Sequence, residues 1–508
     1  MRRAWPARAG LGWPRPGWGV LLAVLAGVLL VGLPLLPAGG LVIGGAVLLL
    51  TLLQPWFGLA LTLLAAPWGA LEKVALGGSL PLDSGQLLLF LTVAAWLAHG
   101  VVRRRIVLRR TALNLPLALF LLVAALSLLG APSLTYGFRE LLKWVEVALV
   151  MLIVVDLGAA ERSRVRLMVG LVLLSGLSQA LIGIWQFGLR GSGPEHFEIL
   201  GGFYRAYGTF EQPNPYGGFM ALTASLALGV LLGLLAANGP ALRRWWRVGV
   251  RRQAADEGGE VVEGPRPGWF WLFFAAVCAL ACGTALLLSW SRGAWLGFGA
   301  GLAMMGLFWP RRRWQGVLLL VGGGLLLLLG LQSGLVPASV ADRLVSFQED
   351  ARFEDVRGVD INDSNYAVLE RLAHWQSALA MARTHPWLGV GFGNYEPAYA
   401  SYALLNWPYP LGHAHNYYLN ILAETGVLGL AAYLLLWSVT FGQTWWLLRR
   451  LAWPQRGVAL GLLAAWTALT VHHLLDNLYV NNLYLHLGVM LGILQLLARE
   501  NESGVYSR

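Results

Sequence analysis

Long apolar runs separated by short polar gaps dominate the chain. Most runs are about 17 to 25 residues long, the length that an α-helix needs to cross roughly 30 Å of hydrocarbon. Runs such as 318–331 do not alternate between apolar and polar positions, so they do not fit the strands of a membrane-spanning barrel. The pattern therefore predicts an all-α protein, a polytopic transmembrane helix bundle.

The apolar runs and their helix breakers together predict about fourteen spans. They lie near residues 18–37, 40–53, 57–67, 84–101, 112–130, 140–157, 166–187, 213–236, 269–289, 293–309, 315–332, 417–446, 457–475 and 483–498. The first run is too long for the core of a signal peptide, so we expect a retained helix. The second and third are short and are separated only by Gln54-Pro55-Trp56, so a re-entrant pair here would give twelve spans. Both counts are even and place the two termini on the same side.

Basic residues fall in alternate gaps between these runs. The clusters are Arg103–Arg105 with Arg109 and Arg110; Arg162, Arg164 and Arg166; Arg243, Arg244, Arg247, Arg251 and Arg252; Arg311–Arg313; and Arg449, Arg450 and Arg456. Because cytoplasmic loops carry the excess of Lys and Arg, these gaps are predicted to be cytoplasmic, and the protein to lie in the inner membrane.

Composition agrees with a membrane protein. The chain of 508 residues is 57% hydrophobic and only 12% charged, against about 25% charged residues in average chains. A net charge of +11 in a soluble protein would suggest nucleic-acid binding. Here the charge follows the gaps between spans, and no nucleic-acid-binding module is recognisable, so no nucleic-acid partner is expected.

The chain divides into three predicted parts. Residues 1–331 form an N-terminal transmembrane bundle, which contains a cytoplasmic linker at 241–267 with Gly-Gly and Pro. Residues 332–416 form one long extracytoplasmic loop, and residues 417–508 form the C-terminal transmembrane helices and a polar cytoplasmic tail. Loops of this length usually carry function. Two shorter segments, 68–84 and 188–212, are expected on the same side as the long loop.

The long loop contains a predicted amphipathic helix over residues 366–383. Its apolar positions are spaced 4-3-4-3, which makes one stripe on a helix; they are Val368, Leu372, Trp375, Leu379 and Ala382. Asp363-Ser364-Asn365 offers N-cap residues, and Pro386 ends the helix. We expect this helix to pack on the outer end of the bundle.

Four segments on the predicted outer side are rich in polar residues and in glycine or proline. They are 205–215, 291–295, 370–394 and 413–426. Arg292, in the second segment, stands at the end of a span on the side that normally lacks arginine. It is either a snorkelling interface residue or the partner of an anion. Arg371 lies on the flank of the loop helix, where a solvated helix face is the alternative. Two outward arginines suit a diphosphate, because the guanidinium fork matches phosphate oxygens.

His413 and His415 precede a predicted span. Histidine can act as a general base near neutral pH. The pair is also a possible metal site, but no cysteine or paired carboxylate nearby completes a set of ligands, so no metal is expected. His472, His473 and Asp476 lie near the outer end of a later span and are expected to pack or to support the site. Gly389, Gly391 and Gly393 precede no helix and are expected to form a tight turn. Cys278 and Cys282 are predicted to be packing residues.

Taken together, these motifs resemble the O-antigen ligase/polymerase family of bacterial envelope glycosyltransferases. The resemblance rests on motif order. Gly-Thr-Phe and Pro-Asn in 208–214 come first, and Ser-Arg-Gly at 291–293 follows. His-Pro with Gly-Val-Gly-Phe-Gly-Asn at 385–394 comes next, and His-Asn-Tyr-Tyr-Leu with Glu-Thr-Gly at 415–426 closes the set. It covers residues 110–495 and is strongest over 200–430.

The resemblance implies an enzyme without cofactor or metal at the outer face of the cytoplasmic membrane. Its donor would be a glycan on undecaprenyl diphosphate, and its acceptor a hydroxyl of lipid A core, of a growing glycan or of a protein. By motif order, Arg292, Arg371 and His415 are the catalytic residues that the resemblance implies, with His413 as the alternative histidine. The predicted substrate-binding residues are Arg205, Asn214, His413 and Asn416. Direct attack on the anomeric carbon would invert its configuration.

A transporter or flippase of lipid-linked glycans is the competing prediction. It would also need outward arginines, but it would favour repeated halves and charged groups at the midplane of the membrane. This chain has no visible internal repeat and gathers its polar residues in one outer loop, which favours an enzyme. Ligase and polymerase share the motif pattern, so the sequence leaves glycan and acceptor open.

Overall fold

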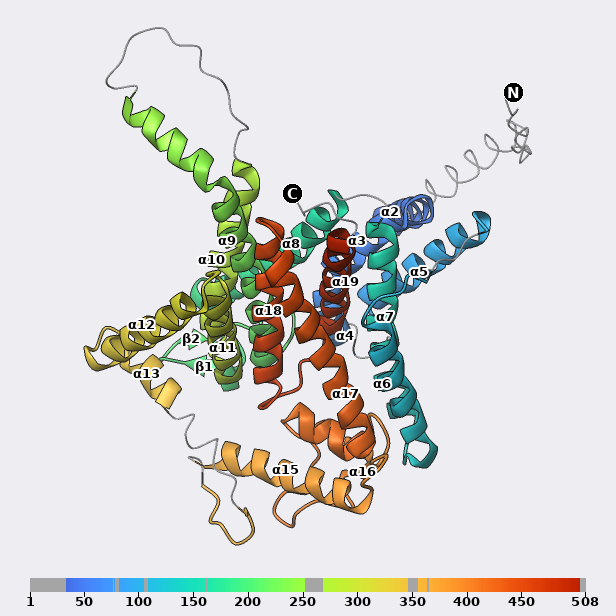
Figure 1. Cartoon of the computed structure of the whole chain (residues 1–508). Helices are drawn as coiled ribbons and strands as arrows, with labels where there is room; N and C mark the ends of the chain where they lie inside the picture. Colours follow the sequence, from blue (N-terminus) through green and yellow to red (C-terminus); the bar gives the residue numbers. More distant parts are fainter. Residues whose placement is uncertain are drawn as a thin grey trace.

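The structure is a computed structural model that describes residues 33–75, 77, 82–104, 108–159, 163–251, 268–345, 355–362 and 365–502. Helices form nearly all of its regular structure, and they pack into one bundle (Figure 1). The prediction of an all-α polytopic bundle is therefore confirmed. Most of the predicted first span, the linker residues 252–267, the N-cap candidates Asp363 and Ser364, and the tail residues 503–508 lie outside the described residues.

The regular elements follow in chain order. The N-terminal helices are α2 (Leu35–Leu53), α3 (Pro55–Ala65), η1 (Ala66–Trp68), α4 (Gly69–Ala75), α5 (Ser84–Val102), α6 (Asn114–Ser127), η2 (Leu128–Gly130), α7 (Leu134–Gly158) and α8 (Ser163–Gly188). Then come η3 (Glu195–Phe197), β1 (Glu198–Ile199), β2 (Phe203–Tyr204), α9 (Pro213–Arg251), α10 (Trp269–Leu288), α11 (Arg292–Phe308) and α12 (Arg313–Gln332). The last are α13 (Ala338–Val345), α15 (Tyr366–Thr384), α16 (Tyr395–Tyr399), α17 (Tyr417–Arg450), α18 (Gln455–His472) and α19 (Leu483–Glu502).

Every predicted span from 40–53 onward coincides with a helix. Among the described residues, eight helical segments are long and apolar enough to cross a membrane, and the other spans are shorter or more polar. The protein is thus a multi-pass membrane protein. The helix is interrupted between α2 and α3 at Gln54, where the sequence predicted a possible re-entrant turn.

Glycines set the closest helix contacts. On α9, a Cβ at Gly229 or Gly233 would lie within 3 Å of the backbone of Gly461 or Gly457 on α18. Farther along the same face of α18, Gly297 of α11 faces the carbonyl of Ala468 just as closely. Small residues four apart let transmembrane helices approach each other in this way. One face of α18 therefore packs against both α9 and α11, and these contacts fix the ends of α18 relative to those of α11.

The polar gaps between the helices meet at one end of the bundle, and the basic gaps meet at the opposite end. At one end, the Thr209 hydroxyl donates to the Pro67 carbonyl at 2.6 Å, and the Phe392 amide donates to the Ser127 hydroxyl at 2.9 Å. At the other end, the Arg456 guanidinium donates to the Phe308 carbonyl at 2.9 Å. The alternation of polar and basic gaps along the sequence thus becomes two chemically different ends.

The long loop forms α13, α15 and α16, of which α15 and α16 pack against the lower end of α17 while α13 lies beside α12 (Figure 1). The predicted loop helix is confirmed as α15, and it ends just before Pro386. Its buried face differs from the predicted stripe. Leu372 and Ala382 are buried, but His374 and Ser377 are buried beside them, whereas Trp375 is half-buried. These polar residues enter the core because each has a buried hydrogen-bond partner. The ring of His374 lies against a tyrosine hydroxyl, and the Ser377 hydroxyl donates to a backbone carbonyl.

The predicted linker is helical in its first part. Helix α9 continues to Arg251, ten residues past the predicted start of the loop at Ala241. Ala, Leu and Arg after Pro240 are strong helix formers, which explains the extension. Helices of the predicted N-terminal part pack on those of the C-terminal part, as α9 does on α18, so the three-part division stays a prediction.

Candidate active site

A small cavity of about 60 Å³ lies where the ends of α11 and α18 meet the long loop. Its lining is mostly polar and contains four arginines; the residues are Arg205, Asn214, Ser291, Arg292, Gly293, Arg343, Arg371, His472, Leu475 and Asp476. They come from five separate parts of the chain. A volume of this size holds about four to six waters, which is the scale of a phosphate group and smaller than a sugar.

The segment before α9 carries Arg205. A short β1–β2 hairpin brings the chain back, and the Ala206 amide then donates to the carbonyl of Leu288 at the end of α10. The guanidinium of Arg205 donates to the Ser289 carbonyl at 3.0 Å and to the side-chain oxygen of Asn214 at 3.3 Å. Two predicted substrate-binding residues, Arg205 and Asn214, are thus bonded to each other at the cavity.

Arg292 occupies the first turn of α11. The Ser291 hydroxyl caps this helix by accepting from the amide of Ala294. A helix N-terminus carries partial positive charge and favours anions, so an arginine there adds to an electropositive site. Next to it, a Cβ on Gly293 would lie 2.7 Å from the ring of His472, so only glycine lets α18 approach this closely. In the Ser-Arg-Gly motif, the serine therefore caps the helix, the arginine supplies the charge and the glycine allows the close contact with α18.

Two further arginines reach the cavity from the long loop. Arg371 projects from α15 and is half-buried. Arg343 projects from α13, and its guanidinium donates to the Trp290 carbonyl at 3.3 Å. The sequence had left Arg371 between a solvated face and a functional role, and the structure places it in the cavity with Arg292.

The arginines repel one another. Burial lowers the pKa of Arg205 to about 10, and the charges of Arg343, Arg292 and Arg371 add to this effect. Arg205 still carries its proton at neutral pH, so the four side chains hold like charges around one small volume. An anion in that volume would relieve the repulsion and gain bidentate hydrogen bonds. The cavity is thus suited to a phosphate-containing ligand.

Three side chains beside the cavity form an acid–base cluster. His413, His415 and Asp476 place ligand-type atoms within 4.8 Å of one another. The His413 Nε2 atom lies 3.5 Å from the Asp476 carboxylate, and the His415 amide donates to His413 Nδ1 at 3.0 Å. With Nδ1 accepting, neutral His413 carries its proton on Nε2, facing Asp476. Asp476 also lines the arginine cavity, so it joins the two halves of the site.

His415 has an unused ring nitrogen. Its Nε2 is buried and has no hydrogen-bond partner among the described residues. Burial, the nearby His413 and Arg371 lower the pKa of His415 to about 3, against the opposing effect of Asp476. The imidazole is therefore neutral at neutral pH and can accept a proton. Backbone φ is +51° at His415, a conformation that costs a non-glycine residue energy and is found at functional sites.

The glycine-rich turn at 389–393 supports this cluster by bonding to the backbone where α17 is interrupted. Gly426 has φ +63°, which interrupts the helix, and the Val427 amide then donates to the Pro386 carbonyl. The Val390 and Gly391 amides donate to carbonyls of residues 423 and 424. A Cβ at Gly389 would lie 2.3 Å from the Glu424 backbone. The predicted tight turn is confirmed, and it fixes the long loop to the span that follows the histidines.

Several predicted site residues therefore converge. Arg205, Asn214, Arg292 and Arg371 line the cavity, and His413 and His415 adjoin it through Asp476. Asn416 instead caps α17, because its side-chain oxygen accepts from the amides of Tyr418 and Leu419. A substrate contact for Asn416 stays a prediction.

The structure brings one carboxylate, Asp476, to the two histidines. Asp476 is about sixty residues away in the sequence, and only the packing of α17 on α18 brings it close. Sequence reasoning also missed Arg343, which no motif marked. His374 was missed as well; it is buried on α15, and its Nδ1 lies 2.9 Å from the Tyr395 hydroxyl while its ring meets that of His415 edge to face. Burial, reinforced by the charge of His413, lowers the pKa of His374 to about 4.

Comparison with known families agrees with the motifs. Residues 274–434 match the sequence model of the O-antigen ligase family, a range that runs from α10 into α17 and contains Arg292, Arg371 and both histidines. No curated protein sequence matches the chain. The predicted resemblance is thereby confirmed: residues 274–434 of this multi-pass membrane protein match the O-antigen ligase family.

Proposed function

We propose that the protein transfers a glycan from an undecaprenyl-diphosphate carrier to an acceptor hydroxyl at the outer face of the cytoplasmic membrane. One observation carries the proposal. Four arginines from separate segments surround a phosphate-sized cavity, and a neutral histidine with an unused ring nitrogen lies in the adjoining cluster. The match to the O-antigen ligase family supports a glycan as the group that is moved.

The arginines hold the diphosphate in the proposed reaction. Arg292 and Arg371 bind its oxygens, with Arg205 and Arg343 completing the positive surface. As the bond between the anomeric carbon and the diphosphate oxygen breaks, negative charge grows on the leaving group. Fixed cations in a partly buried site stabilise that charge, a contribution worth about 10²–10³ in rate per donor in comparable sites. The cavity volume leaves the glycan outside.

His415 accepts the proton of the acceptor hydroxyl. The acceptor oxygen forms the new bond to the anomeric carbon while undecaprenyl diphosphate departs, so the configuration inverts. The proton moves from the hydroxyl to His415 Nε2 and then to solvent. General base catalysis of this kind contributes about 10²–10⁴-fold. His413, fixed between Asp476 and the His415 backbone, positions the base.

Purified protein in detergent tests this proposal. The donor is undecaprenyl-diphosphate-linked glycan extracted from cells that lack the chain, and the acceptors are membranes of the same cells. We expect release of undecaprenyl diphosphate and an acceptor-linked glycan of inverted anomeric configuration. A flippase needs two membrane faces and consumes no donor in detergent, so donor that stays intact would favour the transporter.

The histidine–aspartate cluster also has the donor types that a divalent cation binds. The proposed reaction uses arginine charge and no metal. We therefore expect a chelator to leave the rate unchanged. Loss of activity on chelation, with recovery on adding a single metal, would overturn this part of the proposal and identify the three residues as ligands.

A further inference from the structure

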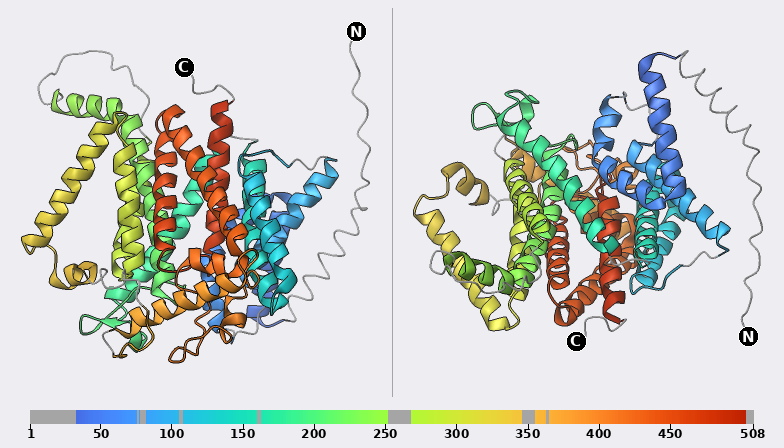
Figure 2. Two further views of the ribbon diagram at one scale, coloured as in Figure 1. Left: turned by 60° about the horizontal axis from the view of Figure 1, so that its bottom comes forward. Right: turned by 90° about the horizontal axis from the view of Figure 1, so that it is seen from above.

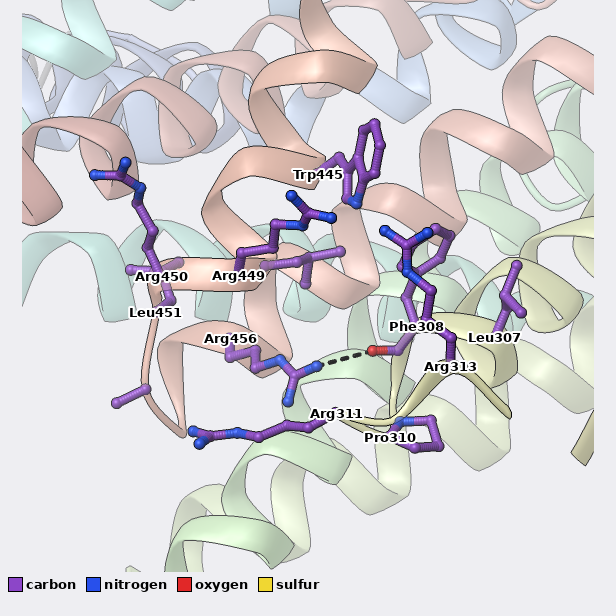
Figure 3. A pocket seen from close by; sticks show the side chains of 12 residues that line it. Leu307, Phe308, Pro310, Arg311, Arg313, Trp445, Arg449, Arg450, Leu451 and Arg456 are labelled. Atoms are coloured by element: carbon purple, nitrogen blue, oxygen red, sulfur yellow. Dashed lines mark hydrogen bonds between the residues drawn. The ribbon is translucent and has the colours of Figure 1, made fainter. Parts of the chain in front are cut away.

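A second basic pocket lies at the opposite end of α11 and α18. Helix α11 has 17 residues and so separates the two sites by about 25 Å. The pocket has a volume of about 540 Å³ and opens between the turn that joins α11 to α12 and the turn that joins α17 to α18. Its lining residues are Leu307, Phe308, Pro310, Arg311, Arg313, Trp445, Leu448, Arg449, Arg450, Leu451, Ala452 and Arg456 (Figure 3).

Five of the lining residues are arginines, and none of the residues lining this described pocket is acidic. Aromatic rings hold the guanidinium groups instead. Arg313 and Arg449 lie over the ring of Trp445 at 5.6 and 4.9 Å from its centroid. Arg456 lies 5.0 Å from the centroid of Trp453. Stacking positions an arginine without neutralising it. The pocket therefore offers oriented positive charge to a ligand.

Arg456 is the one buried member of the group. Its side chain is 5% exposed, and one terminal nitrogen donates to the Phe308 carbonyl at 2.9 Å (Figure 3). Its Nε is buried and has no hydrogen-bond partner among the described residues. The floor of the pocket is thus a fixed cation, while Arg311 and Arg449 stand exposed at the rim.

An apolar surface continues from this pocket. Helix α12 starts at Arg313, on the pocket wall, and only 6% of its most apolar window is buried. It slants away from the rest of the bundle (Figure 2). Leu318 and Leu325–Leu329 are exposed along its length. A soluble anion would make no favourable contact with this apolar surface, whereas the acyl chains of a lipid would pack against it.

We propose that this pocket binds the phosphodiester headgroup of an anionic glycerophospholipid, whose acyl chains run along α12. Basic pockets between helices at the membrane surface bind such headgroups. The volume falls within the range of pockets that hold small molecules, and it exceeds that of the candidate active site about ninefold. The inference does not depend on the transfer reaction, because no residue belongs to both sites.

Lipid binding to the purified full-length chain tests this proposal by native mass spectrometry. The probes are phosphatidylglycerol and cardiolipin, with phosphatidylcholine as the zwitterionic comparison and inorganic phosphate as the soluble one. Arg311→Gln with Arg449→Gln removes two exposed charges from the rim. A basic side chain near an anionic lipid contributes about fivefold in affinity, so we expect anionic lipid to bind roughly 25-fold more weakly.

The matched control is Arg103→Gln with Arg104→Gln, an exposed pair that follows α5 and lines none of this pocket. It should bind anionic lipid as the wild type does. Arg311→Lys with Arg449→Lys keeps the charge and should retain most of the binding, which separates charge from a folding defect. Equal binding of phosphatidylcholine, equal loss in both Gln pairs, or displacement of lipid by millimolar phosphate would overturn the proposal.

Discussion

At one end of α11 and α18, four arginines surround a cavity of about 60 Å³, whereas at the other end five arginines line a pocket of about 540 Å³. The first group faces histidines and a buried carboxylate. The second group stacks on tryptophans and has no acid in its lining. The two sites share residue type and helices but differ in volume and in neighbouring residues.

That difference separates two uses of arginine. In a small cavity, fixed cations can stabilise charge that develops during a reaction, and a nearby base gives the reaction a proton acceptor. In a wide, open pocket, the same side chains are screened by solvent and suit a charge that is already present, such as a headgroup. Small volume and the presence of a titratable neighbour, more than the number of arginines, mark the candidate active site.

The side of the membrane on which each arginine site lies can be tested with an all-or-none outcome. A reporter active only outside the cytoplasm, fused after Gly358 in the long loop, should be active, and one fused after Arg312 should be silent. The two fusions differ by helix α12, which is among the helices apolar enough to span. The reverse result would place the basic pocket outside and remove the proposed role of the histidines in envelope glycan transfer.

Loss of the proposed base should give the largest change in rate. His415→Ala should lower transfer about 10²–10⁴-fold, while binding of undecaprenyl diphosphate stays near the wild-type level because the arginines are intact. His413→Ala should be milder, since His413 positions the base. His385→Ala, at the exposed end of α15, is the control for a lost imidazole. Near wild-type transfer in His415→Ala would make His413 the candidate.

Arg371→Lys tests the fork geometry of the cavity. Lysine keeps the charge but loses the paired hydrogen bonds, so we expect transfer to fall about 10²-fold while the protein still inserts and accumulates. Arg383→Lys on the exposed face of the same helix should keep full activity. If the Arg371→Lys and Arg371→Ala variants both transfer glycan at the wild-type rate, Arg371 has no role in transfer and belongs to a solvated helix face.

The pH profile should show the smallest effect and reports on the base itself. Transfer requires neutral His415, and burial lowers the pKa of this group in the free protein to about 3. The acid limb of kcat/KM should therefore lie below pH 6.5, the ordinary histidine value. A bound diphosphate brings negative charge and raises the pKa, so the limb of kcat should lie at higher pH than that of kcat/KM. Two coincident limbs near pH 6.5 would show a solvated histidine.

Local patterns in the sequence predicted much of the fold. The spans, the loop helix α15 and the glycine turn follow from apolar run length, 3.6-residue periodicity and breakers, which are properties of neighbouring residues. The predicted stripe on α15 was shifted because His374 and Ser377 find buried partners, and a hydrophobicity pattern does not contain that information. Helix α9 runs on into the predicted linker because the residues after Pro240 favour helix, and the bounds of the linker stay a prediction.

By itself, the sequence determined that this is a helical membrane protein, where its basic gaps lie, and which motifs bear the family resemblance. It marked Arg205, Arg292, Arg371 and both histidines, because charge in an apolar chain stands out one residue at a time. Only the tertiary structure decided that Asp476 joins the histidines to the arginine cavity, since that contact depends on how α18 packs. Glycine contacts pack one face of α18 against both α9 and α11, and a distance across such a contact depends on three helices together and on no single segment.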